Sequence, residues 1–416
     1  MSSSESTAAN AMLDRPRVLV LATTFPARPE DGTPAFVATL ARSLQDEFEF
    51  TVLVPRVRGS VPSERIDRVN IRRFPYFPRR FEALADGAIL ANLQAQPWRI
   101  VEVPCLFASF WFHAVRTARR ERPSLIHAHW LLPAGLVAMG LSYLSGIPYV
   151  ATAHGADVFA LRGRVATLQR RAVMRRASAT VPTSREIGRA LGFTDAQAME
   201  RAVPMGVDVQ RIDSAVGPRD PQHGRFLFVG RLEEKKGLDI LLAALRHEPG
   251  ATLVVIGEGR DAERLRTFAR TLGVADRVTW LGRQGWGRVM QELRSAYALV
   301  VPSKVASNGD SETTPLVMSE AMAAEVPVIA SRLGGLAEQV VDDQTGLLFE
   351  AGSPASLAGR LHRAMADPDL LAACALAGRS AMIGSLDLET TSRRYRSIYR
   401  RAIERKLTDA AVQEGS

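Results

Sequence analysis

Short continuous apolar runs recur along the chain, and a loop and an amphipathic segment follow them. The first run is Arg17–Ala22, and others lie at Phe50–Val54 and Ala251–Ile256. Runs of this kind are typical of parallel strands that helices cover on both faces. Aromatic residues make up only 6% of the chain, which also favours a mixed fold over an all-β one. The pattern therefore predicts an α/β protein.

The series of strands and helices occurs twice, and a polar segment separates the two series. That segment, Gln210–Gly224, is broken by glycine and proline, as linkers commonly are. A length of 416 residues allows two or three domains. We therefore expect two Rossmann-like doubly wound domains, residues 16–209 and 225–385, facing an interdomain cleft. Further strands are predicted at 124–130, 149–153, 180–182, 202–207, 226–229, 278–281, 298–301 and 327–330.

Two stretches bear on targeting and on membrane insertion. The first fifteen residues are polar and lack an apolar signal region, so we expect a disordered tail. The stretch Trp130–Ala153 carries no charge and is long enough to span a bilayer. Prolines and glycines divide it, however, and we expect a short buried helix, a turn and the buried strand Tyr149–Ala153 instead.

The charge balance predicts an acidic partner. A formal charge of +9 fits a nucleotide, an anionic lipid or a nucleic acid, although no nucleic-acid-binding module is present and aromatic residues are too scarce for base stacking. The segments Ile71–Phe81 and Leu161–Ser178 are rich in arginine. Each is interpreted either as a solvated surface or as a contact with an anionic membrane. The two cysteines, Cys105 and Cys374, indicate no disulfide framework or zinc site, so we expect a reduced, cytoplasmic protein.

The stretch Ser307–Ser331 predicts an anion site at the start of a helix. Thr314 is a good N-cap and Pro315 suits the first helical position. The backbone amides of Leu316 and Val317 would then point at a bound anion, for which phosphate is the usual candidate.

Two glutamates flank this predicted helix start. Glu312 precedes it, and Glu320 lies among apolar residues nearly two turns into the helix. A buried carboxylate needs a hydrogen-bonding partner. Each glutamate alone would be an ordinary surface charge, but the pair beside a helix start favours a binding site.

Cations and a histidine follow other predicted strands. Gly230 begins the loop after the strand at 226–229. Arg231 and Lys236 in that loop either form a solvated surface pair or face a diphosphate and stabilise it as a leaving group without a metal. His154 stands at the carboxyl end of a parallel strand, where open α/β sheets bind ligands, and a hydrogen-bonded core histidine is the alternative. Gly32 lies in the loop after the first strand and is either a plain turn glycine or one that lets a ligand approach the backbone. No metal site is predicted, because the one Asp-x-Asp, Asp367-Pro-Asp369, lies in a turn between helices.

Several motifs together resemble the GT4 family of glycosyltransferases. They are G-R-L-E-E-K-K-G-L-D at 230–239 and H-G-A-D at 154–157. The pair of Glu312 and E-A-M-A at 320–323 also matches, as does P-M-G-V-D at 204–208. The resemblance covers most of the chain. It implies a GT-B fold, a nucleotide-sugar donor, retention of anomeric configuration and no required metal or other cofactor.

The resemblance also implies roles for individual residues. Arg231 and Lys236 would bind the donor diphosphate, Glu312 the hydroxyls of the transferred sugar, and Glu320 the ribose. His154 would lie near the reacting sugar. The predicted catalytic residues are His154, Arg231, Lys236 and Glu312. The predicted donor-binding residues are Gly32, Gly230, Arg231, Lys236, Glu312, Thr313, Thr314, Leu316, Val317 and Glu320.

The chain departs from the family pattern at two positions. Thr313 stands where the family often has glycine, so side-chain bulk would lie beside the donor sugar. Met205 replaces the usual asparagine of the N-G-V-D motif. Gly32 would lie near the acceptor side and the phosphate, and a last helix, residues 386–406, would return to the first domain.

The sequence thus predicts a retaining glycosyltransferase that uses a nucleotide-diphosphate sugar. Its expected acceptor is a lipid-linked or envelope polysaccharide, with peripheral attachment to the inner face of the membrane. A GT-B epimerase or phosphorylase would share the fold, and a non-catalytic protein would bind no nucleotide. A dinucleotide oxidoreductase would need a third glycine after Gly257-Glu258-Gly259, which is missing.

Overall fold

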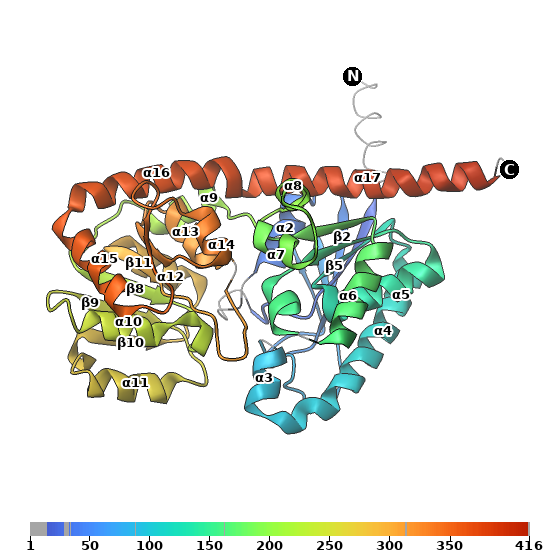
Figure 1. The fold of residues 1–416 in the computed structure, drawn as a ribbon. Coiled ribbons are helices and arrows are strands. Elements are labelled where there is room, and N and C mark those ends of the chain that lie inside the picture. Colours follow the sequence, from blue (N-terminus) through green and yellow to red (C-terminus); the bar gives the residue numbers. More distant parts are fainter. Residues whose placement is uncertain are drawn as a thin grey trace, which may run out of the picture.

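The computed structural model describes residues 15–28, 33, 35–87, 89–161, 163–312 and 314–414. Within these residues the chain forms two α/β domains that lie side by side. The long C-terminal helix α17 (Leu388–Glu414) runs along the first domain (Figure 1). This arrangement confirms the prediction of two Rossmann-like domains.

The first domain contains a seven-stranded sheet of order β3-β4-β2-β1-β5-β6-β7. All neighbouring strands are parallel except β3 and β4. The order reverses between β1 and β5, which is where doubly wound sheets bind ligands. Its strands are β1 (Arg17–Leu21), β2 (Glu49–Pro55), β3 (Ser63–Ile66), β4 (Val69–Phe74), β5 (Leu125–His129), β6 (Tyr149–Ala153) and β7 (Ala179–Pro182).

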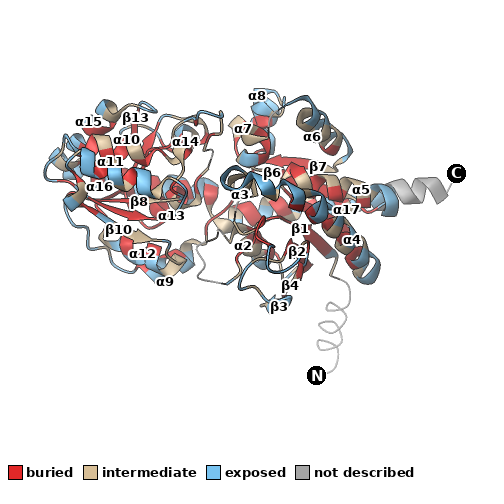
Figure 2. Cartoon of the chain, turned by 90° about the horizontal axis from the view of Figure 1, so that it is seen from below, coloured by how far each residue is buried: buried red, intermediate tan, exposed pale blue. Residues whose placement is uncertain are grey.

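Helices cover both faces of this sheet, and Figure 2 shows that buried residues concentrate between helices and strands. Strands β1, β5 and β6 are almost entirely buried, as their continuous apolar sequences predict. The helices are α2 (Phe36–Ser43), α3 (Ile89–Ala95), α4 (Glu102–Glu121), α5 (Leu136–Ser145), α6 (Arg164–Arg176), α7 (Arg185–Ala190) and α8 (Asp195–Arg201), with 3-10 helix η1 at Pro97–Val101.

The second domain contains a six-stranded parallel sheet of order β10-β9-β8-β11-β12-β13. Its reversal point lies between β8 and β11. The strands are β8 (Arg225–Val229), β9 (Thr252–Ile256), β10 (Val278–Gly282), β11 (Ala298–Val301), β12 (Val328–Ser331) and β13 (Leu347–Phe349). The helices are α9 (Val209–Val216), α10 (Leu238–Leu245), α11 (Ala262–Thr271), α12 (Trp286–Ser295), α13 (Leu316–Ala323), α14 (Gly334–Gln339), α15 (Pro354–Ala366) and α16 (Pro368–Leu386).

Three sequence interpretations need correction. Residues 202–207 form no strand, and only an isolated bridge joins Val207 to Asp387. The range predicted as a linker begins with helix α9. In the arginine-rich segment 71–81, Arg73 lies in β4 with a fully buried side chain, where it pairs with Glu64 and donates to the Pro26 carbonyl. Strand pairing with β2 therefore places part of that segment inside the domain.

The carboxyl ends of the two sheets face each other. Gln94 of α3 accepts a hydrogen bond from Arg260, which follows β9. Glu186 of α7 accepts from the backbone amide of Gly335 in α14, at 3.0 Å. These contacts join loops that follow strands of one sheet to elements that follow strands of the other, so ligands bound at the two sheet ends would meet between the domains.

The C-terminal helix α17 completes the core of the first domain. Tyr395 and Tyr399 are fully buried there. The Tyr399 hydroxyl shares a 2.7 Å hydrogen bond with His127, and the Tyr395 hydroxyl shares a 2.9 Å bond with Thr152. His127 also bonds Thr152, at 2.8 Å. The strand ends of the first sheet are therefore fixed by the last helix of the chain.

Helix α16 is the one described helix whose length and composition alone would allow it to cross a bilayer. Its Leu371, Cys374 and Met382 are buried against the second domain. The uncharged stretch 130–153 forms α5 and the buried strand β6 of the first domain.

Candidate active site

The loop after β8 folds tightly against two neighbouring loops. Gly237 has φ +66°, and a Cβ there would lie 1.8 Å from the Pro302 carbonyl oxygen. Gly257 has φ +144°, and its Cβ would lie 1.8 Å from the Gly230 carbonyl oxygen. No side chain fits at either position. These close approaches bring the loops after β8, β9 and β11 together at the reversal point of the second sheet.

Lys236 and Glu312 meet in this space and form an ion pair, although they are far apart in sequence. Both side chains are largely buried, with exposed fractions of 17% and 14%. The Lys236 stem also lies beside Gly230. The predicted residues Gly230, Lys236 and Glu312 are thus in one place.

Other cations surround Glu312. Burial by itself raises the pKa of Glu312, but the charges of Lys236, Lys235 and Arg231 outweigh burial and bring the pKa to about 2. Lys235 pairs with Asp310 at 2.8 Å. Lys235 and Lys236 are adjacent in this loop and are two of the four lysines in the chain.

Arg231 is the accessible cation of the group. Its side chain is about half exposed, and it donates to Glu233 at 2.7 Å. An exposed guanidinium held by one local partner can turn toward a phosphate, and it binds oxygen pairs in a bidentate manner.

Helix α13 begins one residue later than predicted. Pro315 occupies the N-cap position and the first helical residue is Leu316, so the Thr314 side chain does not cap the helix. The reason is that the Pro315 backbone is extended, with ψ 119°. The amides of Leu316 and Val317 belong to the first turn and have no acceptor within the helix, which makes them available to an anion.

Glu320 on α13 is held by an indole. Trp286, the first residue of α12, donates from Nε1 to Glu320 Oε1 at 2.9 Å. The Arg211 guanidinium lies over the Trp286 ring, 4.1 Å from its centroid. Burial raises the pKa of Glu320, while the Trp286 hydrogen bond and the Arg211 charge oppose that rise. The predicted need for a partner is therefore met by a side chain that the sequence analysis did not identify.

In the first domain His154 follows β6 and lies in a group of rings. It stands 3.3 Å from His129 Nδ1, and the Phe36 and Trp130 ring centroids are 5.0 and 4.8 Å from its own. Burial lowers the pKa of His154 to about 3. The ring is therefore neutral at ordinary pH, and a neutral imidazole can still donate one hydrogen bond.

Asp157 positions the turn that carries His154. Its carboxylate accepts from the backbone amides of His154, at 2.9 Å, and Leu131, at 2.5 Å. It is almost completely buried. Burial raises its pKa to about 7, although the backbone hydrogen bonds oppose the rise. The last residue of the H-G-A-D motif therefore supports the backbone rather than facing a ligand.

Leu316 connects the two halves of the site. It packs against the core of the second domain and against the first-domain cluster that includes Phe36 and Trp130. The amino-terminal end of α13 thus adjoins the rings around His154. Gly32 and Thr313 lie outside the described residues.

Comparison with known proteins matches both halves of the chain. Residues 31–211 match the model described as Glycosyltransferase Family 4, and residues 209–381 match Glycosyl transferases group 1. The D-inositol 3-phosphate glycosyltransferase of Segniliparus rotundus is 32% identical over 350 residues, which cover 76% of each chain. The chain belongs to the GT4-type glycosyltransferases.

Solved structures support the GT-B fold of this glycosyltransferase. Sucrose-phosphate synthase from Thermosynechococcus elongatus has a TM-score of 0.76 at 21% identity, covering 93% of this chain and 99% of its own. Anabaena Alr3699/HepE in complex with UDP-glucose has a TM-score of 0.67 at 18% identity, covering 95% and 100%. At these identities the likeness concerns the fold.

The sequence analysis missed Trp286, Arg211 and Lys235 as parts of the site. Gly285-Trp286-Gly287 was the available signal for Trp286, because a large aromatic residue between glycines is unusual at a helix start. No local pattern marks Arg211, which comes from the range interpreted as a linker. Lys235 was overlooked because its neighbour Lys236 carried the family motif.

Proposed function

We propose that this glycosyltransferase retains anomeric configuration and moves a sugar from a nucleotide-diphosphate sugar to an acceptor hydroxyl without a metal ion. The proposal rests chiefly on the buried Lys236–Glu312 ion pair, with Arg231 beside it, at the reversal point of the second sheet. Cations placed there match the charge of a diphosphate. The complex of Anabaena Alr3699/HepE with UDP-glucose gives independent support for a donor of this class.

The proposed chemistry follows from where charge develops. As the bond between the sugar C1 and the diphosphate oxygen breaks, negative charge grows on the leaving oxygen. Lys236, Arg231 and the amides at the start of α13 stabilise that charge more in the transition state than in the ground state. The acceptor hydroxyl attacks from the same face, and the departing phosphate takes its proton.

Each carboxylate in this proposal binds hydroxyls rather than acting as an acid or a base. Glu312 stays ionised because its pKa is about 2, so it accepts hydrogen bonds from hydroxyls of the transferred sugar. Glu320, oriented by Trp286, accepts from the ribose. His154 is neutral and donates to the reacting sugar from the first domain.

The acceptor belongs to the first domain in this proposal. We assign a lipid-linked or envelope polysaccharide acceptor and a cytoplasmic location at the inner face of the membrane. The support is the arginine-rich surface of the first domain and the exposed thiol of Cys105, which fits a reducing compartment.

A ligand panel tests the donor first. UDP, GDP and ADP sugars are added in turn to the purified chain, and thermal unfolding is followed. A bound donor raises Tm by mass action. The Lys236→Ala variant is the matched control and should lose the shift. No shift with any nucleotide sugar in the wild type would refute the proposed donor class.

Product analysis tests retention and metal independence. The donor that gives the largest shift is incubated with candidate acceptors, and the new linkage is assigned by NMR. We expect the donor's anomeric configuration in the product and equal rates with and without EDTA. Inversion, or activity that EDTA abolishes and Mg²⁺ restores, would contradict the corresponding part of the proposal.

A further inference from the structure

The outer flank of the first domain exposes large apolar side chains that nothing in the described chain covers. Helix η1 and residues 102–112 of α4 carry them. Ile100 is 60% exposed and Phe112 is 62% exposed. The other members are Trp98, Val101 and Phe107.

The neighbouring helices α5 and α6 extend this apolar surface. Tyr143 and Leu144 at the end of α5 are exposed, as are Val165 and Leu168 on α6. Val165, Leu168, Ala172 and Val173 recur at helical spacing on α6, yet only Val173 of these is fully buried. The amphipathic pattern of α6 is therefore only partly used inside the domain.

Contacts show that these elements form one surface. Helices α4, α5 and α6 lie side by side on the flank away from the second domain (Figure 1). Trp111 of α4 packs against Gly140 of α5, and Arg176 of α6 lies over the Tyr143 ring at 5.4 Å. Arg99 of η1 donates to the Phe81 carbonyl, which brings the exposed Phe81 to the same edge.

Exposed arginines lie along this surface. At the carboxyl end of α4 and just after it they are Arg116, Arg119, Arg120 and Arg122. On α6 they are Arg164, Arg171, Arg175 and Arg176. We call these arginines and the exposed apolar side chains of η1, α4, α5 and α6 the apolar–basic face.

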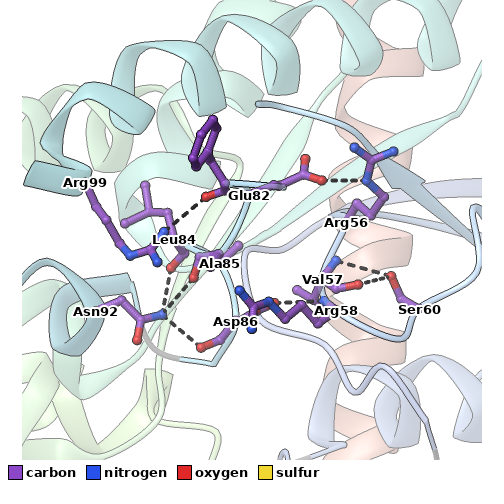
Figure 3. Close-up of polar contacts among 12 residues, drawn as sticks. Arg56, Val57, Arg58, Ser60, Glu82, Leu84, Ala85, Asp86, Asn92 and Arg99 are labelled. Carbon is purple, nitrogen blue, oxygen red and sulfur yellow. Dashed lines mark hydrogen bonds and ion pairs between the residues drawn. The ribbon is translucent and has the colours of Figure 1, made fainter. Parts of the chain in front are cut away.

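Exposed carboxylates are absent from the described residues of segment 75–178, which includes the helices of this face. The described residues from 75 to 178 include five carboxylates, and none of them is in the exposed class: Glu82, Asp86, Glu102, Glu121 and Asp157. Glu82 pairs with Arg56, and Asp86 accepts from the Arg58 amide, as Figure 3 shows. Glu102 pairs with Arg99 and Glu121 with Arg72. Exposed Glu49 of β2 lies near Arg120 at one end of the face, but it pairs with Arg17. Within the described residues of 75–178 the face therefore presents positive charge and apolar groups and no exposed carboxylate.

We propose that the apolar–basic face binds the surface of an anionic lipid membrane. Interfacial binding combines apolar and aromatic side chains that enter the headgroup region with arginines that contact lipid phosphates, and this face carries both. Burial of the apolar groups supplies affinity, and the arginines supply selectivity for anionic lipid.

Charge and composition favour a membrane over other occupants. A nucleic acid would contact the arginines but would gain little from Ile100, Val101, Leu144 or Leu168. A second copy of the chain would place two like-charged arginine rows against each other, which is unfavourable. A lipid surface fits both kinds of side chain.

Vesicle co-sedimentation with the full chain tests the proposal. One set of vesicles is phosphatidylcholine alone, and the other contains equal parts of phosphatidylcholine and phosphatidylglycerol. The wild type should bind the second set more tightly, and added salt should weaken binding. Because the assay involves no sugar transfer, its result is independent of the proposed activity.

Paired variants separate the two contributions. Ile100→Ser with Phe112→Ser should weaken binding about tenfold or more. Arg119→Gln with Arg120→Gln should weaken binding to the anionic vesicles about thirtyfold. Matched controls change exposed residues of the second domain: Leu376→Ser with Ile383→Ser, and Arg246→Gln with Arg270→Gln. Both controls should bind as the wild type does.

Four outcomes would overturn the proposal. They are equal binding to both vesicle sets, no binding to either, loss of binding in the controls that equals the loss in the test variants, and unchanged binding in both test variants. If sedimentation showed a dimer that the Ile100→Ser, Phe112→Ser variant dissociates, and vesicles did not bind, the occupant would be a second copy. If an oligonucleotide bound through Arg119 and Arg120 while vesicles did not, the occupant would be nucleic acid.

Discussion

The two halves of the candidate site differ in how they treat buried polar groups. In the second domain two largely buried lysines each have a carboxylate beside them, as Lys236 has Glu312 and Lys235 has Asp310, while Glu320 has the Trp286 indole. In the first domain three of the buried groups are the rings of His127, His129 and His154, and burial lowers the pKa of each. A fourth is the carboxyl of Asp157, whose pKa burial raises to about 7.

This difference indicates which half handles charge. In the proposed function a diphosphate donor brings negative charge to cations that are already in place, and Lys236 stays beside Glu312 because an unpaired buried carboxylate would be costly. Neutral rings bind sugar hydroxyls and aliphatic faces without competing for that charge. Under the proposed function, leaving-group stabilisation belongs to the second domain and acceptor positioning to the first, and four changes can break or sharpen this comparison.

The largest effect is expected from Lys236→Ala. It removes a cation from the leaving group and leaves Glu312 buried without its main partner, so kcat/KM should fall on the order of a hundred- to a thousandfold. The control is Lys304→Ala, which breaks the similarly buried Lys304–Asp239 pair in the same domain. Steady-state kinetics and Tm are measured for both. If both variants lost activity equally, the comparison would fail.

Asp157→Asn tests the neutral half through pH. The folded-state pKa of Asp157, about 7, lies above its ordinary value of 3.8. Its contribution to stability is therefore complete below about pH 4 and is lost as pH rises through 7. Between about pH 5 and about pH 8 the wild type should lose a few kcal/mol of unfolding free energy relative to the variant.

Urea denaturation at the two pH values measures this difference. The histidines are the same in both proteins, so their contribution to the pH dependence of unfolding cancels. Asp213→Asn is the control of opposite sign. Hydrogen bonding with Arg379 lowers the pKa of Asp213, so its contribution is lost only as pH falls below 3.8. The difference between wild type and this control should stay flat in the same range. If the difference in unfolding free energy between wild type and Asp157→Asn also stayed constant with pH, burial would not raise the pKa of Asp157.

Trp286→Phe tests whether Glu320 needs its orienting hydrogen bond. The change keeps most of the ring but removes the donor to Glu320. The donor KM should rise roughly tenfold, with kcat changing less, because a hydrogen bond to a charged group contributes about 1.5 kcal/mol. Trp280→Phe is the control, since Trp280 also lies beneath an arginine, Arg266. An unchanged donor KM in Trp286→Phe would show that the indole has no role in donor binding.

The smallest effect is expected from Thr314→Ala. Thr314 does not cap α13, so the unfolding free energy should change by less than about 0.5 kcal/mol. The control is Thr194→Ala, because Thr194 caps α8 in a complete capping box and its loss should remove about 1 kcal/mol. Denaturant titration of both variants checks this. A larger loss of unfolding free energy in Thr314→Ala would mean that the Thr314 side chain contributes to the stability of the second domain.

Local sequence patterns were enough for the architecture and for much of the second-domain half. The apolar runs identify the central strands because a strand that is buried on both faces is apolar at nearly every position, without polar residues in alternation. The segments around Arg231, Lys236 and Glu312 come from loops directly after strands, and parallel topology brings such loops to one edge. Their proximity therefore follows once the strand order is known.

Pairings across long sequence distances could not be predicted. Arg73 became internal because β4 joins the sheet beside β2 and carries its arginine to Glu64. Trp286 reaches Glu320 only because α12 and α13 pack in the same domain core. The exposed apolar residues of α6 illustrate the reverse case, since periodicity gives a face but does not say what covers it.

The docking of α17 also affects how the protein is made. Tyr395 and Tyr399 hydrogen-bond Thr152 and His127, yet they are synthesised after the whole second domain. Domains generally fold as their residues emerge. The sheet of the first domain is therefore made early, but His127 and Thr152 lack their tyrosine partners until α17 has emerged. Completion of the first-domain core thus depends on residues made after the second domain.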